Sequence, residues 1–263
     1  MTARSDTLLL QQIDHVLVVT LNRPQAANAM NLAMVTELVD LLFELYLDAG
    51  QTRCVVLTGA GERVFCGGGD MKERATMTAE AVRRQRGMME QLITYLHNCP
   101  VPIIAAVNGA AIGGGCELVA AVDFAYGADT AKFSLPEVRL GISPGAGGTQ
   151  TIPRACGVRR AMELILTGSS FTSHEAHEWG LLNKVLPANE LMDATLEVAR
   201  IISSNAPIAV RQAKKAVAIA PQTDFTTGFR FELEAHGRTA GTRDRQEAIA
   251  AFNEKRAPVF RGE

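Results

Sequence analysis

The hydrophobic positions in the first half of the chain fall into two alternating patterns. Short, continuous apolar runs occupy 15–22, 54–61 and 101–109, and each ends at glycine or shortly before a proline, so they predict buried strands. Between these runs, apolar residues recur every three or four positions over 30–50 and 78–99, which predicts two helices. Strands that alternate with helices favour an α/β fold whose strands pair largely in parallel.

The same alternation continues through the middle of the chain. The segment 114–123 predicts a helix that begins at a run of glycines, and 131–138 predicts a short strand. Two further helices are expected over 158–168 and 173–182, the second with Ser173 as its N-cap.

The last part of the chain has a different character, because glycine becomes rarer and helical spacing dominates. Four helices are predicted there, over 190–204, 207–220, 224–240 and 243–255. No proline- or serine-rich linker separates them from the preceding segment. We therefore expect two regions: a core over 1–189, and a helical region over 190–263 that packs on the core or on a neighbouring subunit.

The composition argues against several classes of protein. The 263 residues are 47% hydrophobic and 21% charged, as in a globular protein with a large core. The net charge of −2 gives no electrostatic reason to expect binding to nucleic acid or to an anionic membrane. The five cysteines have no C-x-x-C spacing, which favours a reduced compartment over a disulfide framework. With no signal-peptide core and no apolar run of membrane-spanning length, we expect a cytoplasmic protein.

Three glycine-rich stretches stand out: "FCGGGD" (65–70), "NGAAIGGGCE" (108–117) and "GISPGAGGTQ" (141–150). None matches the fingerprints of nucleotide-phosphate loops or of a nucleophile elbow. The first two follow the strands predicted at 54–61 and 101–107. If these strands are parallel neighbours, one backbone N–H from each loop can converge on a single oxygen, with a helix N-terminus behind the second. Such a pair would form an oxyanion hole, and the alternative is that the glycines only allow tight turns.

Two glutamates follow these loops in the sequence. Glu117 falls in the first turn of the helix predicted after the glycines, where the helix dipole alone is enough to stabilise it. For Glu137, which follows a proline, the alternative is an exposed turn. If both border one apolar cavity beside an oxyanion hole, they are suited to moving protons at carbons next to a carbonyl group. No metal site is predicted, because His174 and His177 have no evident third ligand.

Several long motifs occur in the order found in a known family. The stretches "VPIIAAVNGAAIGGGCELVAAVDF", "FSLPEVRLGISPGAGGTQTIPRACG" and "EAHEWGLLNKVLP" resemble the enoyl-CoA hydratase/isomerase (crotonase) family. The resemblance extends over essentially the whole chain, from "LNRPQAANAMN" to "AFNEKRAPVF". It implies a crotonase-like spiral of β-β-α units with a C-terminal helical trimerisation region. It also implies a homotrimer, or a hexamer made of two trimers.

The resemblance also implies roles for individual residues. The oxyanion-hole amides fall on Gly69 and Gly114, and the two hydratase carboxylates fall on Glu117 and Glu137. Many members have Ala-Gly-Ala-Asp where this chain has Gly-Gly-Gly-Asp, a change that a main-chain donor tolerates. A position that often holds an aromatic residue near coenzyme A is His236 here. The implied coenzyme A contacts are Arg23, Gln25, Ala26, Ala27, Gly67, Asp70 and Met71, together with Lys255 from a neighbouring subunit.

The resemblance and the carboxylate pair together predict reversible hydration of a trans-2-enoyl-CoA thioester to the 3-hydroxyacyl-CoA. Glu117 would act as the base on the attacking water and Glu137 as the acid that protonates C2, without a metal or a redox cofactor. The stretch "DRQEAIAAFNEKRAPVFRGE" resembles hydratases of branched, glutaconyl-type esters. The segment 71–90 carries arginines that either form a solvated helix face or include one that binds a carboxylate on the acyl chain. These arginines are Arg74, Arg83, Arg84 and Arg86.

Three other functions remain open. A Δ3,Δ2-enoyl-CoA isomerase would need only one of the carboxylates. One branch of the resembled family binds RNA, and "RQAKKA" (211–216) is locally basic, although the net charge of −2 speaks against a non-catalytic scaffold of this kind. A glycosidase could use the carboxylate pair, but only 5% of the residues are aromatic, which leaves few platforms for stacking sugars.

Overall fold

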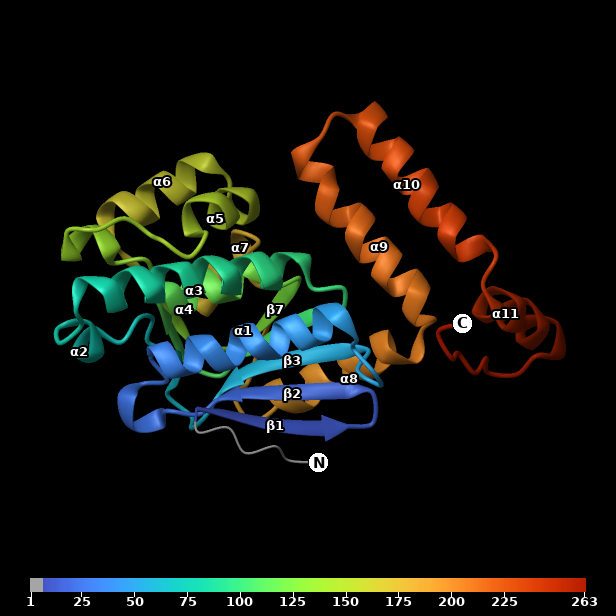
Figure 1. Ribbon diagram of the computed structural model, residues 1–263, viewed down its shortest axis with the longest axis horizontal. Coiled ribbons are helices and arrows are strands. Elements are labelled where there is room, and N and C mark those ends of the chain that lie inside the picture. Colours follow the sequence, from blue (N-terminus) through green and yellow to red (C-terminus); the bar gives the residue numbers. More distant parts are fainter. Residues whose placement is uncertain (1–6) are drawn as a thin grey trace.

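A computed structural model describes residues 7–263 and has a larger sheet of six strands in the order β1-β2-β3-β5-β7-β10 (Figure 1). The strands span Leu8–Ile13, Val16–Leu21, Cys54–Gly59, Ile103–Val107, Phe124–Ala128 and Lys184–Leu186. β1 and β2 form an antiparallel pair, and every later pairing in this sheet is parallel. The predicted α/β class is therefore confirmed, and the three strands predicted first are β2, β3 and β5.

A smaller second sheet has the order β4-β6-β8-β9. Its strands are only three residues long and span Val64–Cys66, Ala110–Ile112, Lys132–Ser134 and Ser170–Thr172. Each of β4, β6 and β8 follows a strand of the larger sheet and leads into helical structure, which produces the expected succession of β-β-α units. Most of these strands were not predicted from the sequence, because a three-residue strand has too little length to show a period.

Helices cover both faces of the larger sheet (Figure 1). On one side, α1 (Leu32–Leu47) packs on α3 (Ala79–Asn98), while α8 (Leu191–Ser204) contacts β2, β3, β5 and β7. Because β3 and β5 are covered on both faces, they are buried along their whole length.

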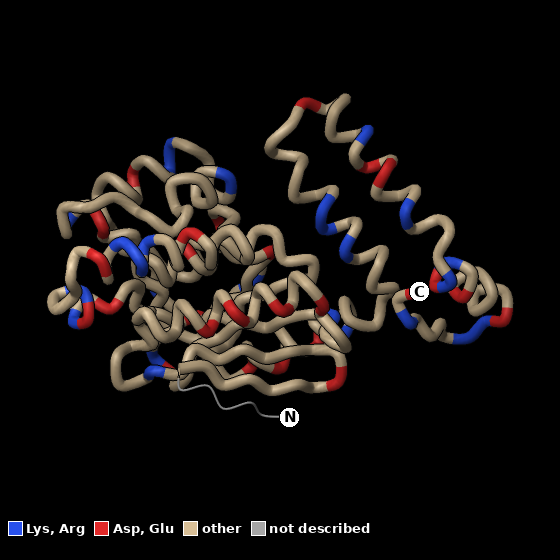
Figure 2. Tube along the Cα trace, in the orientation of Figure 1, with Lys and Arg blue, Asp and Glu red and all other residues tan. Residues whose placement is uncertain are grey.

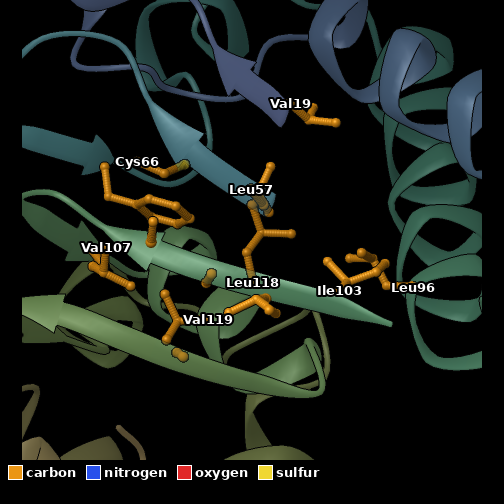
Figure 3. Close-up of a cluster of buried hydrophobic side chains, with 14 of the residues drawn as sticks. Val19, Leu57, Cys66, Leu96, Ile103, Val107, Leu118 and Val119 are labelled. Atoms are coloured by element: carbon orange, nitrogen blue, oxygen red, sulfur yellow. The ribbon is translucent and has the colours of Figure 1, made fainter. Parts of the chain in front are cut away.

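The apolar C-terminal part of the helix α4 (Gly114–Ala121) lies in the hydrophobic core. Its Leu118 and Val119 lie among side chains of β3 and β5, including Leu57 and Ile103 (Figure 3). The predicted helix over 114–123 was therefore too long by two residues. The carboxylate of Asp123 accepts a hydrogen bond from the backbone N–H of Ile103 (2.7 Å), which carries the chain into β7 instead.

The middle of the chain contains short helices. These are α2 (Met71–Arg74), α5 (Gly148–Cys156), α6 (Val158–Thr167) and α7 (Ser173–Glu178), with the 3-10 turns η1 (Pro24–Ala26) and η2 (Glu137–Leu140). The prediction of Ser173 as an N-cap was wrong, because Thr172 caps α7 in a reciprocal capping box with Glu175. Ser173 is instead buried and donates its hydroxyl hydrogen to backbone carbonyls.

Three helices stand away from the body of the molecule (Figure 1). They are α9 (Pro207–Ile219), α10 (Phe225–Ala240) and α11 (Arg243–Glu254), with the turn η3 (Ala220–Gln222) after α9. Lys214 anchors α9 by donating to the carboxylate of Asp123 (2.7 Å) and to the carbonyl of Val101 (2.9 Å). No helix within residues 7–263 is long and apolar enough to cross a membrane.

Candidate active site

Two glycine loops meet backbone to backbone at one edge of the smaller sheet. β4 and β6 are parallel neighbours, so the loops that follow them emerge on the same side. A Cβ atom on Gly68 would lie 2.7 Å from the carbonyl oxygen of Ile112 and 3.2 Å from the amide nitrogen of Gly114, and a Cβ atom on Gly115 would overlap the carbonyl of Cys66. Only glycine allows this approach, so the glycines do more than permit turns.

The backbone amides of Gly69 and Gly114 both lie at this contact. Among residues 7–263, neither donates a hydrogen bond, whereas the neighbouring N–H of Asp70 bonds to Met30 and that of Gly113 to Ser134. A Cβ atom on Gly114 would lie 3.8 Å from the nitrogen of Gly69, so the amides are close together. Gly114 is also the first residue of α4, where the helix dipole adds positive potential.

Glu117 lies in the first turn of α4 and is only 2% exposed. Its Oε1 accepts hydrogen bonds from the backbone N–H groups of Ala146 and Gly148, both at 2.8 Å. Burial raises the pKa of Glu117, and these backbone hydrogen bonds oppose part of the rise. The third glycine-rich stretch therefore holds this carboxylate, which the sequence did not suggest. A Cβ atom on Gly148 would lie 2.8 Å from Oε1 of Glu117.

Glu137 begins η2 and is 7% exposed, so the exposed-turn alternative is wrong. Its Oε1 would lie 2.8 Å from a Cβ atom on Gly113, which has a φ of +53°. Its Oε2 is buried and has no hydrogen-bond partner in the described part of the chain. Burial raises the pKa of Glu137, and the nearby carboxylate of Glu117 raises it further. The fold thus brings both glutamates to the loop that starts α4.

An ion pair joins two of the residues implied to contact coenzyme A. Arg23 donates to Oδ2 of Asp70 (2.9 Å), and Oδ1 of Asp70 caps α2 by accepting from the N–H groups of Lys72 and Glu73 (both 3.1 Å). The hydrogen bond from the Glu73 N–H is the main reason that the pKa of Asp70 is lowered, with Arg23 adding to the effect. These contacts fix the loop that carries Gly69.

The other implied contacts fall into two groups. Gln25, Ala26 and Ala27 lie at η1, and the carbonyl of Ala27 accepts from the N–H of Gly67 (2.9 Å), so this turn lies beside the loop 67–70. Met71 follows that loop and is exposed. Lys255 ends α11, which lies at the opposite end of the molecule from α2 (Figure 1), so one chain does not bring Lys255 to the site.

Comparison with known proteins identifies the family of the chain. The family model described as enoyl-CoA hydratase/isomerase matches residues 11–263. The YngF protein of Bacillus subtilis is 44% identical over 249 residues, which is 95% of each chain, and the short-chain-enoyl-CoA hydratase of Clostridium acetobutylicum is 40% identical over 251 residues, covering 95% of this chain and 96% of the relative. The crystal structure of an enoyl-CoA hydratase from Bacillus anthracis superposes with a TM-score of 0.95 at 44% identity, covering 98% of this chain and 100% of the other.

The chain therefore shares a crotonase-type fold with solved enoyl-CoA hydratases. The chain belongs to the enoyl-CoA hydratase/isomerase family, as the sequence motifs had indicated.

We predict that alanine is tolerated at Gly69 but not at Gly68. At Gly68 the φ of +86° and the 2.7 Å approach to Ile112 both disfavour a Cβ atom. Gly68→Ala should lower the free energy of unfolding by about 1–3 kcal/mol. A Cβ atom on Gly69 would make only ordinary contacts at 3.5 Å, so Gly69→Ala should change it by less than about 1 kcal/mol. Urea unfolding measures both, and equal losses would contradict the loop geometry.

A second prediction concerns stability and pH. Because burial raises the pKa of Glu137, the folded protein binds this proton more tightly than the unfolded chain, and wild-type stability falls as pH rises above the ordinary glutamate pKa. Glu137→Gln removes this loss, so the variant should gain stability relative to wild type between about pH 4 and about pH 8 in urea titrations.

The control variant is Glu175→Gln, whose stability relative to wild type should change with pH in the opposite direction. The capping-box hydrogen bonds lower the pKa of Glu175, so the stability that its charge supplies is present at neutral pH and is lost as pH falls. Glu175→Gln should therefore lose stability relative to wild type as pH rises toward about 5, and the difference should then stay constant up to about pH 8. If the difference in free energy of unfolding between Glu137→Gln and wild type does not change with pH, then folding does not change the pKa of Glu137.

Proposed function

We propose that this protein hydrates a trans-2-enoyl-CoA thioester reversibly to the 3-hydroxyacyl-CoA. The observation that carries the proposal is the position of two buried carboxylates beside two unbonded amides at the start of α4. The hydratase name of the Clostridium acetobutylicum relative supports it. The coarser statement, that the chain is a member of an acyl-CoA enzyme family, rests on the family match itself.

In the proposed reaction, the thioester oxygen accepts hydrogen bonds from the N–H groups of Gly69 and Gly114, and α4 stabilises the negative charge that develops there. Glu117 takes a proton from water as the water oxygen bonds to C3. Glu137 gives its proton to C2, so that one water molecule is added in total. The two roles need one ionised and one protonated carboxyl group, and the like charge of Glu117 favours the protonated form of Glu137.

The nearest alternative is an isomerase that moves a double bond with one carboxylate. The burial of both glutamates at one loop favours the two-carboxylate reaction, and incorporation of oxygen from labelled water separates the two. An RNA-binding scaffold finds little support, because basic and acidic residues alternate along the traced chain (Figure 2). The family match gives no support for a glycosidase.

Other features stay predictions. A branched or glutaconyl-type acyl chain, the absence of a metal or redox cofactor, and a cytoplasmic location are expected from the sequence. A trimer or hexamer is also expected, and exposed phenylalanines on α10 and α11, including Phe225 and Phe252, are the apolar surface that a second copy would cover.

The proposal predicts that both carboxylates are needed for hydration. Glu117→Gln and Glu137→Gln should each lower kcat for crotonyl-CoA by at least about 10²-fold, because an amide of similar size cannot exchange a proton. The double variant should be little worse than either single one, because residues that act as a unit are not additive. Calorimetric titration with butyryl-CoA should show that binding is largely retained.

Glu163→Gln, on an exposed face of α6, is the matched control and should leave hydration unchanged. If only one of the two site variants loses activity, the one-carboxylate isomerase becomes the better assignment. If wild type hydrates crotonyl-CoA and both variants keep that activity, the carboxylate mechanism is wrong.

A pair of substitutions at Gly114 tests the amide donor. Both alanine and proline add a Cβ atom whose closest contact is the flexible end of Met30, at 2.8 Å, and whose next contacts are ordinary ones at 3.6 Å and 3.8 Å. Proline is tolerated at the first position of a helix but lacks the N–H. Gly114→Pro should therefore reduce kcat by about 10²–10³-fold relative to Gly114→Ala. Circular dichroism checks that both fold, and equal activity of two folded variants would exclude this amide as a donor.

A further inference from the structure

One arginine lies directly against the loop that carries a candidate oxyanion-hole amide. A Cβ atom on Gly69 would lie 3.5 Å from both Cζ and Nη2 of Arg74, so the guanidinium covers this glycine from the end of α2. Arg74 is solvent-exposed, and it is the cation that the described residues place against Gly69. Arg74 is therefore next to the position proposed for the substrate thioester.

A buried amide holds the guanidinium in place. Nε of Arg74 donates to Oε1 of Gln85 (3.2 Å), and Gln85 is only 4% exposed. The amide of Gln85 in turn donates to Oε2 of Glu73 (3.2 Å), which also accepts from the backbone N–H of Leu32 (2.9 Å). The carboxylate of Glu73 thus accepts its hydrogen bonds from neutral donors. Gln85 acts as a positioning residue for Arg74.

The outer edge of the guanidinium has no anionic partner. Over residues 7–263, no ion pair includes Arg74, and its one side-chain hydrogen bond uses Nε alone. The two Nη groups together present the parallel donors that bind a carboxylate in a bidentate manner. An arginine held by a neutral amide keeps its full charge available for such a ligand.

The other arginines in this segment behave differently. Arg83, Arg84 and Arg86 lie on exposed positions of α3, and none of them has a side-chain hydrogen bond or ion pair within the described residues. The solvated-face interpretation suits these three. Arg74 departs from it, because its side chain is oriented by a buried residue toward the site.

The two ends of the loop 67–70 have different neighbours. Gly67 contacts Ala27, in the turn proposed to meet coenzyme A, whereas Gly69 contacts Arg74. Because the Gly69 amide is the proposed donor to the thioester oxygen, Arg74 lies near the acyl group in the proposed binding mode, whereas the turn at Ala27 is implied to meet coenzyme A. An anion on the acyl chain suits this position better than a phosphate of coenzyme A.

We propose that Arg74 binds a carboxylate on a short acyl chain, so that the substrate is the mono-CoA ester of an unsaturated dicarboxylic acid. This inference rests on the proposed hydratase function. Arg74 sets specificity by an ion pair with the substrate and takes no part in the proton transfers.

The test compares two substrates that differ in this one charge: glutaconyl-CoA, which carries the carboxylate, and crotonyl-CoA, which does not. Wild type should have the higher kcat/KM for glutaconyl-CoA. Arg74→Met, which keeps the length of the side chain, should lower the glutaconyl-to-crotonyl ratio of kcat/KM by roughly 10- to 100-fold, mainly through KM. Arg74→Lys should restore part of the ratio, and Arg83→Met is the matched control that leaves it unchanged.

A binding measurement supports the kinetics without depending on turnover. Calorimetric titration of the full-length protein with glutaryl-CoA and butyryl-CoA should show the same loss of preference in Arg74→Met. An unchanged ratio in both assays would overturn the proposal. Equal losses for the charged and uncharged esters would also overturn it, since Arg74 would then act on coenzyme A or on the thioester oxygen. If wild type hydrates neither ester, the hydratase function itself fails, which is a distinguishable result.

Discussion

The site depends on one close contact between two backbones. The end of β4 meets the start of α4 where Gly115 lies against the carbonyl of Cys66, and Gly68 lies against Ile112 and Gly114. Any side chain at these positions would push the loops apart. The contact brings the amide of Gly69 within reach of the amide of Gly114, and it aims α4 so that its first turn points its carboxylate into the same space.

The two buried acidic groups at this site are compensated to different degrees. A buried carboxylate is unfavourable unless polar groups compensate it. Glu117 has two backbone donors, Ala146 just before α5 and Gly148 at its start, whereas Glu137 has an oxygen without a partner in residues 7–263. The two groups are therefore unequal, and the environment of Glu137 favours the protonated form more than that of a solvated glutamate does. Such inequality suits a pair of groups that act as base and acid.

Much of the fold was predictable because its signals are local. β2, β3 and β5 are continuous apolar runs, and α1 and α3 have a clear helical period, so each was predicted close to its observed bounds. The four C-terminal helices were predicted equally well. β1, β4, β6, β7, β9 and β10 were missed. Four of them (β4, β6, β9 and β10) are only three residues long and β1 lies at a sheet edge, and such strands carry little periodic signal. The family motifs identified the candidate amides and glutamates before any contact was known.

By itself the sequence determined which elements form, where the glycine loops fall, and which family the chain belongs to. These properties depend on neighbouring residues or on motifs of fixed order. Only the tertiary structure decided that Ala146 and Gly148 hold Glu117, that Glu137 is buried, and that Gln85 turns Arg74 toward Gly69. These contacts join segments that are separated along the chain, and their existence depends on distances and orientations that packing creates and that no local pattern records.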